Sequence, residues 1–318
     1  MKPQRIVLIG GSGFVGEAVA AQLAAAGRNV LVPTRNRERA RNIILLPTIE
    51  AVQADVYDPA TLASLLTGAD AVVNLVGVLH SRRGSPYGPG FKKAHVELPQ
   101  LIVDACKQAG VERLVHISAL GADAAGPSEY QRSKAAGEEV IRNSGLRWII
   151  LRPSVIFGRN DSFINLFASL AGVAPVLPLA CPDARFQPVY VGDVAEVVQR
   201  SLDDPLAGGD THEVTGPSVY TLRELVDYAA TLSGHPRRII GLPNSFASLQ
   251  AFAFEFLPNP PMTRDNLASM SRDNVASGTP LPYGLTPTPI ESVVPTYLGG
   301  NFPRARYYGM RAHARRDV

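Results

Sequence analysis

The chain opens with the stretch Arg5-Ile6-Val7-Leu8-Ile9-Gly10-Gly11-Ser12-Gly13-Phe14-Val15-Gly16. Its first five residues predict a buried parallel strand, and the alanine-rich pattern that runs to Ala26 predicts a helix. Three glycines between them predict a tight turn, which would direct backbone N–H groups and the positive helix end at one point. A pyrophosphate suits that point, although a glycine string is also typical of an ordinary strand–helix turn. The expected cofactor contacts are Gly10, Ser12, Gly13, Phe14, Val15 and Gly16.

Composition indicates an ordinary globular protein. The 318 residues are 46% hydrophobic and 19% charged, and 31 basic residues against 28 acidic ones leave a net charge of +3. That excess lies in residues 301–318, which hold five arginines and one aspartate. No basic stripe interleaved with aromatic residues crosses the rest of the chain, so nucleic-acid binding is not predicted.

The cysteines and the hydropathy pattern indicate a reducing compartment. Cys106 and Cys181 are too few for a disulfide framework or a structural zinc site, and no histidine has a partner at metal-ligand spacing, so we expect no metal. There is no run of 18 apolar residues, which excludes a spanning helix. The first strand follows Met1 almost at once, so we expect no signal or transit peptide and a cytoplasmic location.

Strand and helix patterns alternate through the first half of the chain. This alternation predicts an α/β fold, a Rossmann-type doubly wound parallel sheet with a smaller C-terminal lobe. We expect the dinucleotide-binding domain at residues 1–160, with 186–216 returning to it, the lobe at 161–185 and 217–300, and a basic tail at 301–318. In this fold, ligands bind outside the carboxyl ends of the strands.

Three strand ends carry further candidate cofactor contacts. Sites that select NAD place an acidic residue after the second strand, but this chain has Arg35 and Asn36 there. A guanidinium suits the 2′-phosphate, so we favour NADP(H) over NAD(H), while a solvated loop arginine stays the alternative. Asp55 and Val56 follow the third strand and would meet the adenine, unless Asp55 only shapes a turn. Val76 and Gly77 end the fourth strand, where backbone would approach the ribose.

A second group of residues suits hydride chemistry. Tyr130 and Lys134 are four residues apart on one predicted helix, and Ser118 ends the fifth strand. The phenol would act as acid or base, the ammonium would lower its pKa, and the serine would hold the substrate oxygen. Lys134 would also bond the nicotinamide ribose. An exposed tyrosine beside a solvated lysine is the alternative.

Together these motifs and the run Arg152-Pro153-Ser154 resemble the extended and atypical short-chain dehydrogenase/reductases, over residues 1 to about 235. The resemblance implies that Pro153 and Ser154 close over the nicotinamide. The runs His116–Asp123 and Ser133–Glu138 are similar to the NADPH-binding accessory subunit family of respiratory complex I, whose bacterial and fungal relatives are linked to ubiquinone biosynthesis.

The resemblance leaves three functions open. The first is an NADP(H)-dependent oxidoreductase acting on a small carbonyl, alcohol or quinone-pathway compound. The second is a non-catalytic NADPH-holding assembly protein with a respiratory-chain or quinone-biosynthesis partner. The third is a sugar-nucleotide epimerase or dehydratase, although residues 160–240 show no arginine pattern for a diphosphate.

Residues 245–257 form an unusually phenylalanine-rich late helix. Such a stretch usually belongs to a core, and we expect it to cover the second lobe. The alternative is a face presented to a partner or to the inner face of a membrane, helped by the arginine tail.

Overall fold

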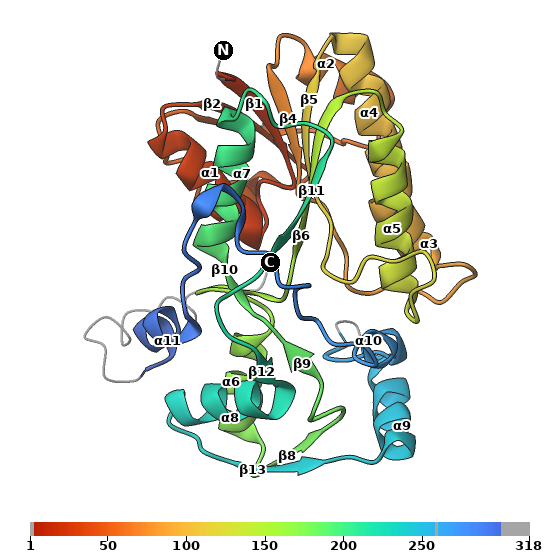
Figure 1. Cartoon of the computed structure of the whole chain (residues 1–318), viewed down its shortest axis with the longest axis vertical. Coiled ribbons are helices and arrows are strands. Elements are labelled where there is room, and N and C mark those ends of the chain that lie inside the picture. Colours follow the sequence, from red (N-terminus) through yellow and green to blue (C-terminus); the bar gives the residue numbers. More distant parts are fainter. Residues whose placement is uncertain (1–2, 258–259, 300–318) are drawn as a thin grey trace. The chain divides into compact units, whose positions relative to one another are not determined.

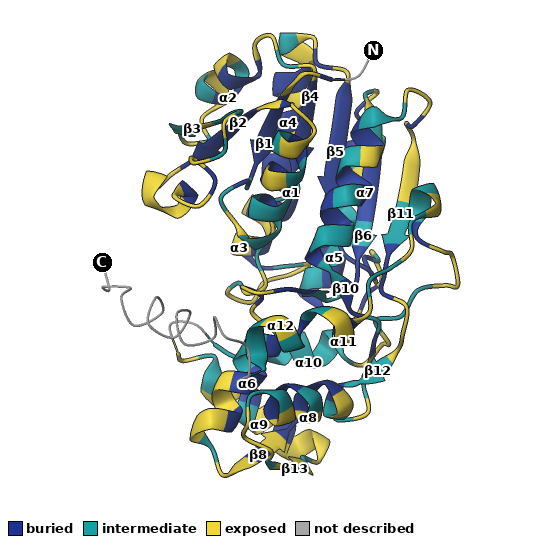
Figure 2. Cartoon of the chain, turned by 90° about the vertical axis from the view of Figure 1, so that its left-hand side faces the viewer, coloured by how far each residue is buried: buried dark blue, intermediate teal, exposed yellow. Residues whose placement is uncertain are grey.

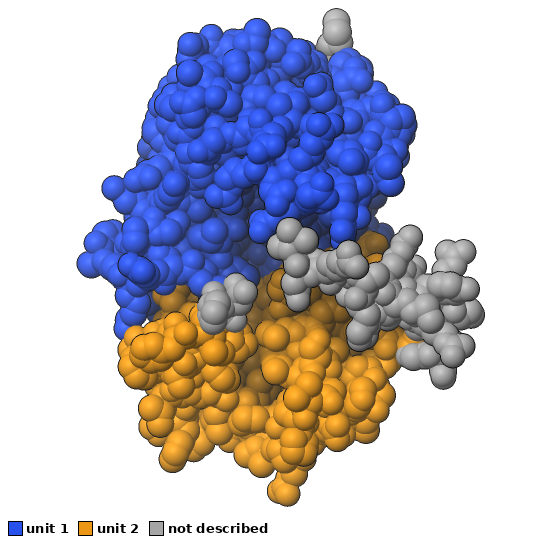
Figure 3. Space-filling view, turned by 180° about the vertical axis from the view of Figure 1, so that it is seen from behind, with its two compact units in different colours: residues 1–154, 191–215, 276–286 blue, residues 155–190, 216–275, 287–318 orange. Residues whose placement is uncertain are grey.

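The computed structural model describes residues 3–257 and 260–299, and it divides the chain into two compact units (Figures 1 and 3). Unit 1 comprises residues 1–154, 191–215 and 276–286; unit 2 comprises residues 155–190, 216–275 and 287–318. Nothing in the sequence pattern of 276–286 predicts its return to unit 1. The basic tail expected at 301–318 lies outside the described residues.

Unit 1 contains a seven-stranded parallel sheet, which confirms the predicted fold class. Its strand order is β11 (Asp210–Val214), β6 (Arg147–Pro153), β5 (Arg113–Ile117), β4 (Ala71–Asn74), β1 (Arg5–Ile9), β2 (Asn29–Thr34) and β3 (Ile49–Gln53). The central strands are almost wholly buried because helices cover both faces, as Figure 2 shows.

Helices α1 (Phe14–Ala25) and α7 (Val191–Asp203) pack together on one face of the sheet (Figure 1). The other face carries α2 (Pro59–Leu66), α4 (Leu98–Ala109) and α5 (Glu129–Arg142). A core of leucine, isoleucine and valine side chains fills the space beneath these three helices. The capping box predicted at Ser128 and Gln131 forms and fixes the start of α5.

The helix that leads into α4 is not uniform. It starts as α3 (Pro89–Lys92), continues through the π-helical segment η2 (Lys93–Glu97) and becomes α4, with a proline in its first turn. A π-helical turn widens the backbone and is frequent at functional sites. The wide turn holds His95.

Unit 2 is built from short elements. Three two-stranded pairs join β7 (Ile156–Phe157) to β10 (Val189–Tyr190), β9 (Arg185–Phe186) to β12 (Tyr220–Thr221), and β8 (Val176–Leu179) to β13 (Arg238–Gly241). Helices α6 (Ile164–Val173) and α8 (Leu222–Leu232) pack against each other around an apolar core. Short helices α10 (Arg264–Ser269), α11 (Ile290–Val293) and α12 (Pro295–Leu298) complete the unit.

The expectation that residues 245–257 form core is wrong. Helix α9 (Asn244–Phe254) buries only Ala247 and Ala251, and its phenylalanines lie largely on the surface. Within residues 3–257 and 260–299, no helix is long and apolar enough to cross a membrane.

Candidate functional site

The carboxyl ends of six strands of unit 1 carry the residues that the sequence singles out. All neighbouring strands are parallel, so these ends meet at one edge of the sheet. The residues are Gly10 after β1, Arg35 after β2, Asp55 after β3, Val76 after β4, Ser118 after β5, and Pro153 with Ser154 at the end of β6. This edge is where α/β folds bind nucleotides.

The turn between β1 and α1 has no room for larger residues. Gly10 has a φ of +84°, which favours glycine, and a Cβ on Gly16 would lie 2.4 Å from the Gly10 carbonyl oxygen. Gly13 precedes α1 and brings no side chain to cap it. The first-turn N–H groups of Phe14, Val15 and Gly16 therefore keep their capacity for an anion, so the turn fits a dinucleotide pyrophosphate.

The end of β2 presents a cation beside that turn. Arg35 is exposed directly after β2, and Ser12 Oγ lies 3.3 Å from Thr34 Oγ1, which joins the end of β2 to the glycine turn. Asn36 has a different use: its Oδ1 accepts a hydrogen bond from the Glu38 N–H and caps the short helix η1 (Arg37–Ala40). The Asn36 side chain is thus engaged locally, whereas Arg35 faces solvent.

The end of β3 contains an aromatic residue that the sequence interpretation missed. Asp55 Oδ1 accepts from the Tyr57 N–H at 3.0 Å, and Val56 between them is half-buried. Burial raises the pKa of Tyr57, and the charge of Arg35 opposes that rise, which shows that the two side chains are close. Lys93 Nζ lies 4.4 Å from the centre of the Tyr57 ring. Two cations and one ring therefore surround the position expected for the adenosine end of a dinucleotide.

The end of β4 lies against Lys134. The Val76 N–H donates to Asn74 Oδ1, and a Cβ on Gly77 would lie only 3.2 Å from Lys134 Nζ. Any larger residue at position 77 would crowd the ammonium. Because Gly77 has no side chain, the Lys134 ammonium can lie close to the backbone at the end of β4.

Ser118, Tyr130 and Lys134 are brought to the same region. Lys134 on α5 is buried and its Nζ donates to the Ile117 carbonyl oxygen at 3.2 Å, next to Ser118. Tyr130 lies one turn earlier on α5 and is half-buried. Ser118 is also buried, and its Oγ has no hydrogen-bond partner among the described residues. A buried hydroxyl without a partner points to a group that binds there.

The expected effect of Lys134 on Tyr130 is not found. Burial raises the pKa of Tyr130 to about 12. Burial also lowers the pKa of Lys134 to about 8, although the charge of Glu138 opposes this. Desolvation therefore sets the pKa of the Tyr130 phenol, which is protonated at neutral pH.

Two buried histidines support this region. The His95 Nε2 accepts from the Val78 N–H at 3.1 Å, and its Nδ1 lies 2.8 Å from Ser133 Oγ on α5. The His95 ring also packs edge-on against the Tyr130 ring. Burial lowers the pKa of His95 to about 2 and that of His116 to about 3, so both are neutral. Both rings are buried and have hydrogen-bond partners. The described parts of the chain contain no group of side chains that could hold a metal ion.

The end of β6 is held to α5 by an ion pair. Pro153 and Ser154 are buried, and the Ser154 N–H donates to the Val214 carbonyl oxygen. Arg152, one residue before them, makes two hydrogen bonds to the fully buried carboxylate of Glu138 on α5. The strand end and the helix that carries Tyr130 are therefore held together.

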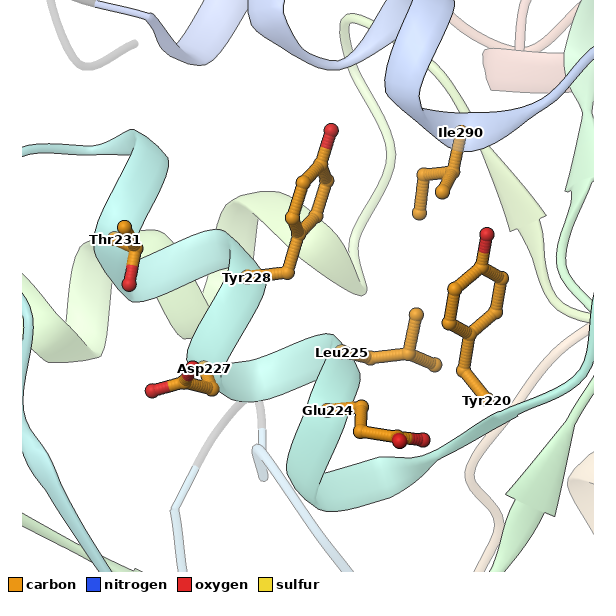
Figure 4. A pocket seen from close by; sticks show the side chains of 7 residues that line it. All are labelled: Tyr220, Glu224, Leu225, Asp227, Tyr228, Thr231 and Ile290. Atoms are coloured by element: carbon orange, nitrogen blue, oxygen red, sulfur yellow. The ribbon is translucent and has the colours of Figure 1, made fainter.

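Unit 2 contains a separate open pocket of about 370 Å³. Figure 4 shows the side chains that line it: Tyr220, Glu224, Leu225, Asp227, Tyr228, Thr231 and Ile290. Tyr220 Oη donates to Glu291 at 2.6 Å. None of the residues singled out from the sequence lines this pocket.

Comparison with known proteins agrees with this geometry. A family described as NAD(P)H-binding matches residues 10–165. Subunit 9 of the alpha subcomplex of mouse mitochondrial NADH dehydrogenase [ubiquinone] is 32% identical over 294 residues, covering 89% of this chain and 77% of the relative. A ceramide reductase of Caulobacter vibrioides is 27% identical, covering 75% of this chain and 74% of the relative.

Solved structures show the same fold. The crystal structure of a dTDP-glucose 4,6-dehydratase from Streptomyces venezuelae with bound NAD has a TM-score of 0.66 and 25% identity, covering 75% of this chain and 85% of that one. These matches confirm the resemblance noted in the sequence and support nucleotide binding without distinguishing NADP from NAD. The chain belongs to the NAD(P)H-binding, epimerase/dehydratase-like family of short-chain dehydrogenase/reductase folds that includes subunit 9 of the alpha subcomplex of NADH dehydrogenase.

Proposed function

We propose that this protein is an NADP(H)-dependent reductase of a carbonyl compound. The observation that carries the proposal is the buried Ser118 Oγ without a partner, next to the strand end that Lys134 binds. A substrate oxygen would supply the missing hydrogen bond and satisfy an otherwise costly buried hydroxyl. Tyr130 lies one turn before Lys134 on α5 and would supply a proton donor in the same region.

Each residue of the site would have its own role in carbonyl reduction. A bound nicotinamide would supply the hydride to the carbonyl carbon. Ser118 would hold the carbonyl oxygen, and the protonated phenol of Tyr130 would give it a proton as negative charge develops there. Lys134 would return a proton to Tyr130 and bond the ribose. Val76, Gly77, Pro153 and Ser154 would line the sugar and the nicotinamide, while Gly10, Ser12, Gly13, Phe14, Val15 and Gly16 would hold the pyrophosphate.

The cofactor we propose is NADP(H). Arg35 is exposed at the end of β2, with no carboxylate beside it in sequence until Glu38. A planar guanidinium can bind the 2′-phosphate with two parallel hydrogen bonds. Lys93 beside Tyr57 adds a second positive charge to this part of the edge. Asp55 and Val56 would contact the adenine.

A second candidate is a protein that holds the nucleotide without turnover. The similarity to a complex I subunit supports it. In that case the nucleotide would stabilise the fold, and a respiratory-chain or quinone-biosynthesis protein would be the partner. NADPH at a hundred times its Kd would add about 2.7 kcal/mol to the free energy of unfolding.

Turnover and binding of the same protein separate the two candidates. NADPH oxidation is followed with small ketones, a quinone and a ceramide-related carbonyl, using wild type, Tyr130→Phe and Ser118→Ala. A reductase should lose at least about a hundredfold in rate in Tyr130→Phe, with an unchanged rise in Tm on adding NADPH. A holding protein should show that rise in all three proteins and oxidise NADPH in none. Equal turnover in wild type and Tyr130→Phe would overturn the catalytic assignment.

A further inference from the structure

Helix α9 in unit 2 buries small side chains and exposes large apolar ones, the reverse of an ordinary amphipathic surface helix. Its buried residues are the small Ala247 and Ala251, one turn apart, while Phe246 and Leu249 are 61% and 62% exposed. Phe252 is exposed on the same side, because residues spaced by three or four share a helix face. Ala247 and Ala251 therefore face the protein, whereas Phe246, Leu249 and Phe252 face outward.

The exposed face continues beyond both ends of α9. Phe256 and Leu257 follow the helix and are 76% and 48% exposed, and the Phe256 ring stacks edge-on against Phe252. Ile240 on β13 precedes the helix and is 44% exposed. We call Ile240, Phe246, Leu249, Phe252, Phe256 and Leu257 the apolar end of unit 2. In Figures 1 and 2, α9, β8 and β13 lie at one end of that unit.

Charge is arranged around the apolar end, not within it. The eleven residues of α9 include no charged side chain. Arg238 on β13 is exposed, and no carboxylate of the described residues forms a salt bridge with it. Arg264 lies 4.8 Å from the Phe252 ring, but it is paired with Glu255 at 2.7 Å. The sequence then closes with five arginines and one aspartate in residues 301–318. Arg238, which has no salt bridge within the described residues, and the arginine-rich end of the sequence both carry positive charge.

We propose that the apolar end of unit 2 inserts into the surface of an anionic lipid bilayer. Outward phenylalanine and leucine side chains would enter the boundary between headgroups and acyl chains, and arginines would meet the phosphate groups. A protein partner fits less well, because the residues that contribute most of the binding energy at protein interfaces are tryptophan, tyrosine and arginine, and the apolar end contains none of them. An uncharged apolar face that follows the exposed Arg238 of β13 matches an anionic lipid surface.

Flotation of the full-length protein with vesicles tests the proposal. Wild type should float with vesicles of phosphatidylcholine and phosphatidylglycerol and less with phosphatidylcholine alone. Phe246→Ser/Leu249→Ser should bind at least about tenfold more weakly, since each buried side chain of this size contributes more than a tenfold factor when fully transferred. The matched control is Leu45→Ser/Leu206→Ser, which removes two leucines that are 83% and 89% exposed in unit 1. This control should bind like wild type.

Three outcomes would overturn the proposal. Wild type could fail to float with either vesicle, or both double variants could bind equally well. Light scattering could also show a wild-type dimer that Phe246→Ser/Leu249→Ser converts to a monomer without any vesicle binding, which would make the face a contact between two copies. Because all four positions are exposed, the Tm of each variant should stay within a few degrees of wild type, and that measurement confirms folding.

Discussion

Gly16 is the position where helix α1 passes closest to the glycine turn. A Cβ there would lie 2.4 Å from the Gly10 carbonyl oxygen and 2.5 Å from the Gly11 Cα. Both are backbone atoms, so the overlap cannot be relieved by rotating a side chain. Overpacking of this kind costs about 1–3 kcal/mol, against a gain of about 1 kcal/mol from replacing glycine by alanine within a helix. We expect Gly16→Ala to lower the free energy of unfolding by up to about 2 kcal/mol.

Gly172 on α6 is the matched control. A Cβ on Gly172 meets nothing closer than His235 Cε1 at 4.0 Å, so Gly172→Ala should gain up to about 1 kcal/mol. Thermal unfolding with and without NADPH measures both effects. At a hundred times the wild-type Kd, NADPH should stabilise wild type and Gly172→Ala by about 2.7 kcal/mol. If Gly16→Ala binds tenfold more weakly, the same concentration should stabilise it by about 1.4 kcal/mol.

The comparison separates damage to the fold from damage to the nucleotide site. If Gly16→Ala lost stability but kept the full NADPH-dependent gain, the turn would not hold the pyrophosphate. If it matched Gly172→Ala in both measurements, the overlap itself would be refuted. Isothermal titration calorimetry of the same two variants provides the Kd directly.

Three further predictions concern charge. Arg35→Glu should weaken NADPH at least about tenfold and leave NADH within about threefold, because it removes a charged hydrogen bond to the 2′-phosphate; fluorescence titration of both nucleotides checks this. Burial lowers the pKa of Lys134 from 10.5 to about 8. The unfolded chain then binds that proton more tightly, so stability should rise between pH 8 and 10.5 in urea unfolding, and Lys134→Met should flatten the rise. Burial lowers the pKa of His116 from 6.5 to about 3. Its neutral form thus contributes stability that is lost as pH falls from 6.5 towards 3, and His116→Gln should reduce that loss in thermal scans.

Much of the fold was predictable because its signals are local. The glycine turn, the buried strands and the capping box at Ser128 each depend on a few neighbouring residues. The strand ends could then be placed at one edge from the parallel topology alone. Lys134 reaches the end of β5, next to Ser118, because the helix that follows a parallel strand packs back onto the sheet.

The features that escaped prediction depend on packing between distant segments. The π-helical turn at His95 forms where α5 comes close, since a Cβ on Gly137 would lie 2.0 Å from the His95 carbonyl oxygen. The cation over the Tyr57 ring comes from Lys93, which lies 36 positions further along the chain. The exposed face of α9 follows from two alanines that pack inward, a choice that hydrophobic composition does not reveal.

The protonation of Tyr130 bears on the direction of the reaction. With a pKa of about 12, the phenol can donate a proton at neutral pH but cannot accept one until it is first deprotonated. Reduction of a carbonyl needs the donor, whereas oxidation of an alcohol needs the base. We therefore expect reduction to be constant in rate up to about pH 8 and to fall above it, as Lys134 loses the proton that restores the phenol. Initial rates in both directions across pH 6 to 10 provide the measurement, with Lys134→Arg, which stays charged, as the comparison. Faster oxidation than reduction at pH 7, at equal saturation, would show that nucleotide binding lowers the pKa of Tyr130 and that burial does not control the chemistry.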